Sequence, residues 1–74
     1  MGRRSLNQTV AQNVSDAIAA AELSPSVVAE AADLTLPELE ARLVGDVDFN
    51  VPELVRVGGF LRIRPSAFME EVAA

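Results

Sequence analysis

Apolar residues recur at spacings of three and four along the first part of the chain, which is the period of one face of an α-helix. They are Leu6, Val10, Val14, Ala17, Ile18 and Ala21. Polar side chains occupy most of the positions between them. This pattern predicts an amphipathic helix over residues 6–21.

Two helix-start signals follow. Ser24 precedes Pro25, and a serine cap followed by proline favours a helix because the first amides of a helix lack intrahelical partners. Thr35 and Glu38 have the spacing of a capping box, in which each side chain accepts a hydrogen bond from the other residue's backbone amide. These signals predict a helix over 25–32 and a third helix that begins directly after the threonine.

The third helix has a regular apolar pattern. Leu36, Leu39 and Leu43 lie on one face of it, and Gly45 can adopt the left-handed backbone that ends a helix. Residues 24–44 are therefore predicted to pack as two short helices joined by a tight turn.

A fourth helix is predicted to begin after Asn50, because Asn50 and Glu53 repeat the capping box, and to continue to Leu61. Gly58 and Gly59 lie inside it, where each glycine costs about 0.8–1 kcal/mol relative to alanine. Two explanations are open for these glycines: close approach of a neighbouring helix backbone, or a hinge.

Pro65 is predicted to begin a short fifth helix that continues through Val72. Phe68 is expected in the core, and Met69 at a contact with a second copy of the chain. No repeat or low-complexity segment interrupts the pattern, so we expect one domain over residues 1–74, with residues 1–5 as an N-terminal arm.

Composition narrows the chemistry. The 74 residues include no cysteine and no histidine, which excludes disulfides, the usual zinc sites and the commonest general base. We expect no cofactor, no metal and no enzymatic activity. The apolar runs are far shorter than the roughly 20 residues that span a bilayer, so we expect no membrane contact and a cytoplasmic location.

Several residues share a register over much of the chain. They are Leu23-Ser24, Val28-Ala29, Leu34, Leu39 and Gly45, followed by the runs 49–54 and 61–66. This register resembles the DNA-binding domain of the lambda repressor and Cro-like family. The resemblance implies an all-α fold, a compact bundle of five short helices with a helix-turn-helix formed by the second and third.

The resemblance also implies a small DNA-binding transcriptional regulator that acts as a homodimer on double-stranded DNA. In the family the start of the third helix enters the major groove, and the corresponding residues are Thr35, Leu36, Pro37, Glu40 and Ala41. Arg42, Asn50 and an arm carrying Arg3 and Arg4 are expected to contact the DNA backbone.

The groove-facing positions carry none of the Arg, Lys, Asn or Gln side chains that mainly read base edges. Leu36 or Ala41 can contact a thymine methyl group, and Glu40 can accept a hydrogen bond from a cytosine amine. Arg42 has two alternatives, a phosphate contact or an ion pair with Glu38 four residues earlier.

The charge balance supports a second hypothesis. Six cations, all arginine, face eleven acids, and the net charge of −5 disfavours nonspecific attraction to a polyanion. The alternative is a helix-turn-helix scaffold that has lost DNA binding and acts as an acidic interaction module for a basic protein. Its acidic face would consist of Glu38, Glu40, Asp46, Asp48 and Glu53.

Overall fold

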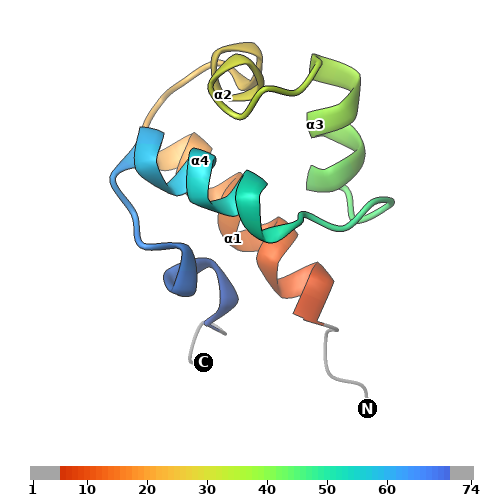
Figure 1. Cartoon of the computed structure of the whole chain (residues 1–74), viewed down its shortest axis with the longest axis vertical. Helices are drawn as coiled ribbons and strands as arrows, with labels where there is room; N and C mark the ends of the chain where they lie inside the picture. Colours follow the sequence, from red (N-terminus) through yellow and green to blue (C-terminus); the bar gives the residue numbers. More distant parts are fainter. Residues whose placement is uncertain (1–5, 71–74) are drawn as a thin grey trace.

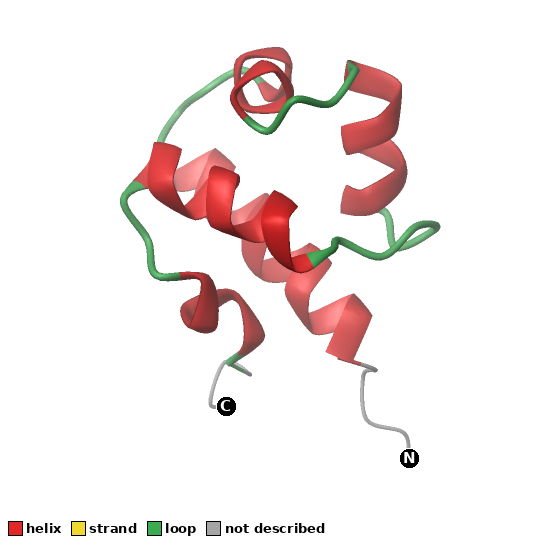
Figure 2. Cartoon of the chain, in the orientation of Figure 1, coloured by secondary structure: helices red, strands yellow, loops and turns green. Residues whose placement is uncertain are grey.

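The computed structural model describes residues 6–70, which form four α-helices and one short 3-10 helix around a shared core, with no strand in that range (Figures 1 and 2). The elements are α1 (Leu6–Ala20), α2 (Pro25–Ala31), α3 (Leu36–Leu43), α4 (Val51–Leu61) and η1 (Pro65–Met69). The predicted starts of the first four helices are confirmed, and the predicted ends of the first two lie one residue too late.

The predicted caps all form. The Ser24 side chain accepts from the Ser26 amide at 3.2 Å. In the first capping box Thr35 Oγ1 accepts from the Glu38 amide at 3.2 Å, and Glu38 Oε1 accepts from the Thr35 amide at 2.8 Å. The second box joins Asn50 and Glu53 in the same way, at 2.8 and 3.1 Å. Local side chains therefore determine where α2, α3 and α4 begin.

Each of the four α-helices is followed, one or two positions after its last residue, by a residue with a left-handed backbone. These residues are Glu22, Asp33, Gly45 and Arg62, with φ between 58° and 88°. The next amide then bonds back to a carbonyl five residues earlier, as Asp46 does to Ala41 at 2.9 Å. The predicted stop at Gly45 is confirmed, and the other three helices reach the same geometry with side chains that adopt it less readily.

The core draws on every element. Its buried residues are Val10, Val14, Ile18, Val28, Ala29, Ala32, Leu39, Leu54, Val57 and Phe68. The prediction that residues 24–44 pack as two short helices joined by a tight turn is confirmed, since Val28 and Leu39 are fully buried and Leu34 and Leu43 pack against the core. Leu36 is an exception, because it lies 37% exposed at the start of α3 and not with the other two leucines of that helix.

The predicted fifth helix begins at Pro65 as expected, but it is short and does not continue past Met69. Pro65–Met69 form a 3-10 helix, and the backbone of Glu70 is extended. The side chain of Asn13 in α1 donates to the carbonyl oxygens of Phe68 and Glu70, at 2.7 Å in both cases. A side chain thus satisfies carbonyls that another helical turn would have used. Val72 lies outside the described residues.

The two glycines of α4 have different surroundings. A Cβ atom on Gly58 would overlap the carbonyl oxygen of Ile63 and touch Phe68, whereas a Cβ on Gly59 would meet nothing within 4 Å. Close backbone approach therefore explains Gly58, although the approaching backbone is the segment after α4 and not a neighbouring helix. Gly59 lies on the open face of α4.

Among the described residues, the longest helix has 15 residues, and none combines the length and apolar character required to cross a bilayer.

Candidate nucleic-acid interface

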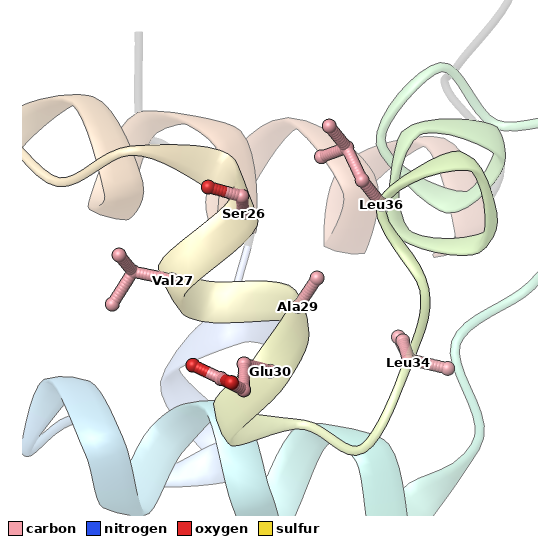
Figure 3. Close-up of a pocket in the computed structure, with 6 residues that line it drawn as sticks. All are labelled: Ser26, Val27, Ala29, Glu30, Leu34 and Leu36. Atoms are coloured by element: carbon pink, nitrogen blue, oxygen red, sulfur yellow. The ribbon is translucent and has the colours of Figure 1, made fainter.

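The helices α2 and α3 form a two-helix unit joined by residues 32–35. In Figure 1 α2 is seen almost along its axis, whereas α3 runs across the view, so the two helices cross steeply. Ala29 is 2% exposed and lies on the side of α2 that faces α3 (Figure 3). A methyl group at this position permits the close packing of α2 on α3, because a larger side chain would force the helices apart.

The start of α3 projects into solvent. Thr35, Leu36, Pro37 and Glu40 are exposed, and Ala41 is half-buried. The Thr35 hydroxyl oxygen already accepts a hydrogen bond from the Glu38 amide in the capping box. Four of the five predicted groove-facing positions therefore share an exposed surface around the first turns of a helix whose opposite face is held in the core by Leu39.

A shallow groove of about 430 Å³ opens between α2 and the first turn of α3 (Figure 3). Its lining residues are Ser26, Val27, Ala29, Glu30, Leu34 and Leu36. Val27 and Leu36 are 42% and 37% exposed and make this surface partly apolar. An apolar rim next to a projecting helix can contact methyl groups, but the groove contains no cation that could bind a phosphate.

Arg42 pairs with Glu53, which was neither of its two predicted partners, a phosphate and the Glu38 carboxylate. Its Nε and Nη2 atoms donate to the two carboxylate oxygens of Glu53 at 2.9 and 3.1 Å, and Nη1 donates to the backbone carbonyl of Glu38 at 2.8 Å. The predicted ion pair with the Glu38 carboxylate is wrong, because that carboxylate bonds to the Thr35 amide. Arg42 instead links α3 to α4 through a bidentate pair.

The pair is largely withdrawn from solvent, with the Arg42 and Glu53 side chains 15% and 8% exposed. Burial tends to raise the pKa of the Glu53 carboxyl, but hydrogen bonds from Arg42 and the Asn50 amide, together with the charge of Arg42, lower this pKa below its ordinary value. The hydrogen bond to Glu53 raises the pKa of Arg42. Both groups are therefore charged at neutral pH, and each neutralises the other.

The Arg42–Glu53 pair removes Glu53 from the predicted acidic face, because Glu53 is 6% exposed and its charge is compensated by Arg42. Glu38, Glu40, Asp46 and Asp48 are exposed. Hydrogen bonding to the Thr35 amide lowers the pKa of the Glu38 carboxyl, which keeps that group ionised. The surface of α3 and the turn after it is therefore acidic, and the cation within α3 is already paired.

Of the other predicted backbone contacts the described residues include Asn50, and the described arginines outside α3 are dispersed over α4 and the segment after it. Asn50 is exposed, but its side-chain oxygen caps α4. Arg56 lies on α4, and Arg62 and Arg64 follow the end of α4 that points away from α3 (Figure 1). Arg3 and Arg4 lie outside the described residues.

Sequence reasoning missed the role of Glu53. The available signal was Arg42 itself, which lies three residues after Leu39 and next to Leu43, at the edge of the apolar face of α3. A charged residue at such a position requires a buried partner of opposite charge. Glu53, 11 residues away, supplies it.

No family model, no curated protein and no solved structure matches the chain. Among residues 6–70 there is no cluster of His, Cys, Asp and Glu side chains arranged to hold a metal ion. A functional proposal therefore depends on the residues and the fold of this chain alone.

Proposed function

We propose that the protein is a small, non-enzymatic DNA-binding transcriptional regulator that places the start of α3 in the major groove of double-stranded DNA. The observation that carries this proposal is the two-helix unit, in which buried Val28, Ala29 and Leu39 fix α3 on α2 while Leu36 and Glu40 project from it. A rigidly held helix with an exposed first turn is the element that helix-turn-helix proteins insert into DNA.

With the start of α3 in the major groove, few side chains are placed to contact base edges. Leu36 and the half-buried Ala41 contact thymine methyl groups, and the Glu40 carboxylate accepts from a cytosine amine. Backbone affinity depends on the N-terminal arm with Arg3 and Arg4, because Arg42 is held by Glu53. Affinity should therefore be modest, and the logarithm of the association constant should decrease linearly with the logarithm of the salt concentration.

Fluorescence anisotropy at low salt, with duplexes that tile the DNA flanking the protein's own gene, tests the proposal. Replacing Glu40 with glutamine should weaken binding to the preferred duplex by about tenfold, the cost of one good base contact. Removing an acid that makes no base contact should instead strengthen binding to a polyanion. Glu22→Gln, an exposed acid outside α3, is the matched control.

Absence of binding to every flanking duplex at low salt would refute the proposal. Equal strengthening by Glu40→Gln and Glu22→Gln would remove the base contact assigned to Glu40.

A second function is favoured by one observation, the acidic surface of α3 and the following turn in which Arg42 is neutralised. On this hypothesis the same surface binds a basic protein. Reversal of Glu40 and Asp46 to lysine should release that partner in pull-downs from the native host, whereas reversal of Asp16 and Glu22, an equal change of charge elsewhere, should retain it. Glu38 is left intact because it caps α3. Retention of every partner by the first variant would exclude this function.

A further inference from the structure

The outer face of α4 is apolar and exposed. Val51, Val55 and Phe60 are 63%, 51% and 43% exposed, and Pro52 and Gly59 are also open to solvent. Within α4, Arg56 is the charged residue on this face, since Glu53 is buried on the other side. Figure 2 shows α4 on the near side of the molecule with α1 behind it, so this face is at the surface.

The two ends of α4 carry opposite charges. Asp46 and Asp48 are exposed in the turn before the helix, and Arg62 and Arg64 are exposed directly after it. The helix dipole has the opposite polarity, with its positive end near the acids and its negative end near the arginines, so each end is locally compensated. An apolar strip between an acidic end and a basic end is self-complementary to a copy running in the opposite direction.

We propose that a second copy of this chain packs on the outer face of α4, with the two α4 helices antiparallel about a twofold axis at Val55. A twofold contact uses the same surface on both copies, so each favourable pairing occurs twice. In this register Val55 packs on the second copy's Val55, and Val51 packs on the second copy's Gly59, because residues four apart lie on the same side of a helix.

The same register brings the charged ends together. Asp46 and Asp48 of one copy lie beside Arg62 and Arg64 of the other, twice per dimer. This pairing matters because each chain carries a net charge of −5, which opposes association of two copies. Gly59 permits close approach, since nothing in its own chain lies within 4 Å of the position that a Cβ would occupy.

The inference does not depend on DNA binding, and it is tested without DNA. Sedimentation equilibrium should give an average mass that rises with concentration from 7.9 kDa towards twice that value. Val55→Glu should abolish the rise, whereas Val27→Glu, at an exposed valine on α2, should keep it. Circular dichroism should show the same helix content for both variants. A mass of 7.9 kDa up to about 1 mM, or equal behaviour of the two variants, would overturn the proposal.

Charge reversal tests the antiparallel register itself. Asp46→Arg with Asp48→Arg should raise the dimer dissociation constant by about tenfold, because the new arginines face Arg62 and Arg64 of the second copy. Adding Arg62→Asp and Arg64→Asp should restore the original constant. Failure of this restoration would show that the ends do not meet and would overturn the register.

Cysteine cross-linking gives a measurement that does not depend on affinity. The chain has no cysteine, so Val55→Cys places one thiol near the proposed twofold axis. A short bis-maleimide should cross-link this variant into dimers, whereas Val44→Cys, at a 72% exposed position outside α4, should stay monomeric. Equal cross-linking of the two variants would contradict the assigned face.

Discussion

Replacement of Arg42 with methionine is expected to lower the free energy of unfolding by about 2–4 kcal/mol, because it leaves the Glu53 carboxylate buried without its counter-charge. The expected loss is smaller than for a fully buried pair, because the two side chains retain 15% and 8% exposure. Methionine preserves most of the apolar stem and the helix propensity of arginine. Thermal unfolding followed by far-ultraviolet circular dichroism measures the change, since the chain has no tryptophan or tyrosine.

The double variant Arg42→Met with Glu53→Gln is the control. Glutamine can still accept from the Asn50 amide and so retain the capping box, but it carries no charge. The double variant should therefore be more stable than Arg42→Met alone. If the two variants are equally stable, the loss comes from packing at position 42 and not from an uncompensated carboxylate.

The same pair determines the response to acid. The folded protein holds the pKa of Glu53 below its ordinary value, so the pair's contribution to stability is fully present above about pH 4.3. It is lost as the pH falls through the lower pKa of the folded state, where protonation uncouples Glu53 from Arg42. Glu38 acts in the same direction. Unfolding of Arg42→Met/Glu53→Gln should accordingly depend less on pH in this range than unfolding of the unaltered protein.

Alanine at position 58 is expected to destabilise the protein by about 2–3 kcal/mol, although alanine normally favours a helix. The new methyl group would overlap the Ile63 carbonyl oxygen, which is backbone and can move only if the end of α4 is rebuilt. That rebuilding would break the 2.8 Å bond from the Ile63 amide to the Gly58 carbonyl. Denaturant titration followed by circular dichroism measures the loss.

Gly59 supplies a matched comparison one residue away. Its position is open, so Gly59→Ala should stabilise the protein by about 0.8–1 kcal/mol through helix propensity alone. Opposite signs for adjacent glycines would locate the constraint at the turn after α4. Stabilisation by both substitutions would mean that the Ile63 carbonyl is not held against the helix.

Helix starts were predictable from the sequence because their causes are local. Ser24, the box of Thr35 with Glu38 and the box of Asn50 with Glu53 each act within three residues. The burial of Leu39 followed from its place on the apolar face of the third helix, because that periodicity also acts within one helix.

The predictions from sequence failed where the local structure depends on side chains that are distant in the sequence. The partner of Arg42 lies on the next helix, and the end of η1 depends on Asn13, which is 55 residues from Phe68 in the sequence. Neither interaction leaves a periodic signal. The exposure of Leu36 also depends on the angle at which α3 crosses α2, which periodicity within one helix does not specify.

The packing of η1 on α1 has a consequence for synthesis on the ribosome. Phe68 is 2% exposed and is the bulkiest fully enclosed side chain among the described residues, yet it joins Val14 and Ile18 only after the chain has extended past position 68. A nascent chain that ends earlier exposes those aliphatic side chains to water. The core around α1 can therefore close only after η1 has left the ribosome, and until then the aliphatic side chains of α1 are accessible to a chaperone.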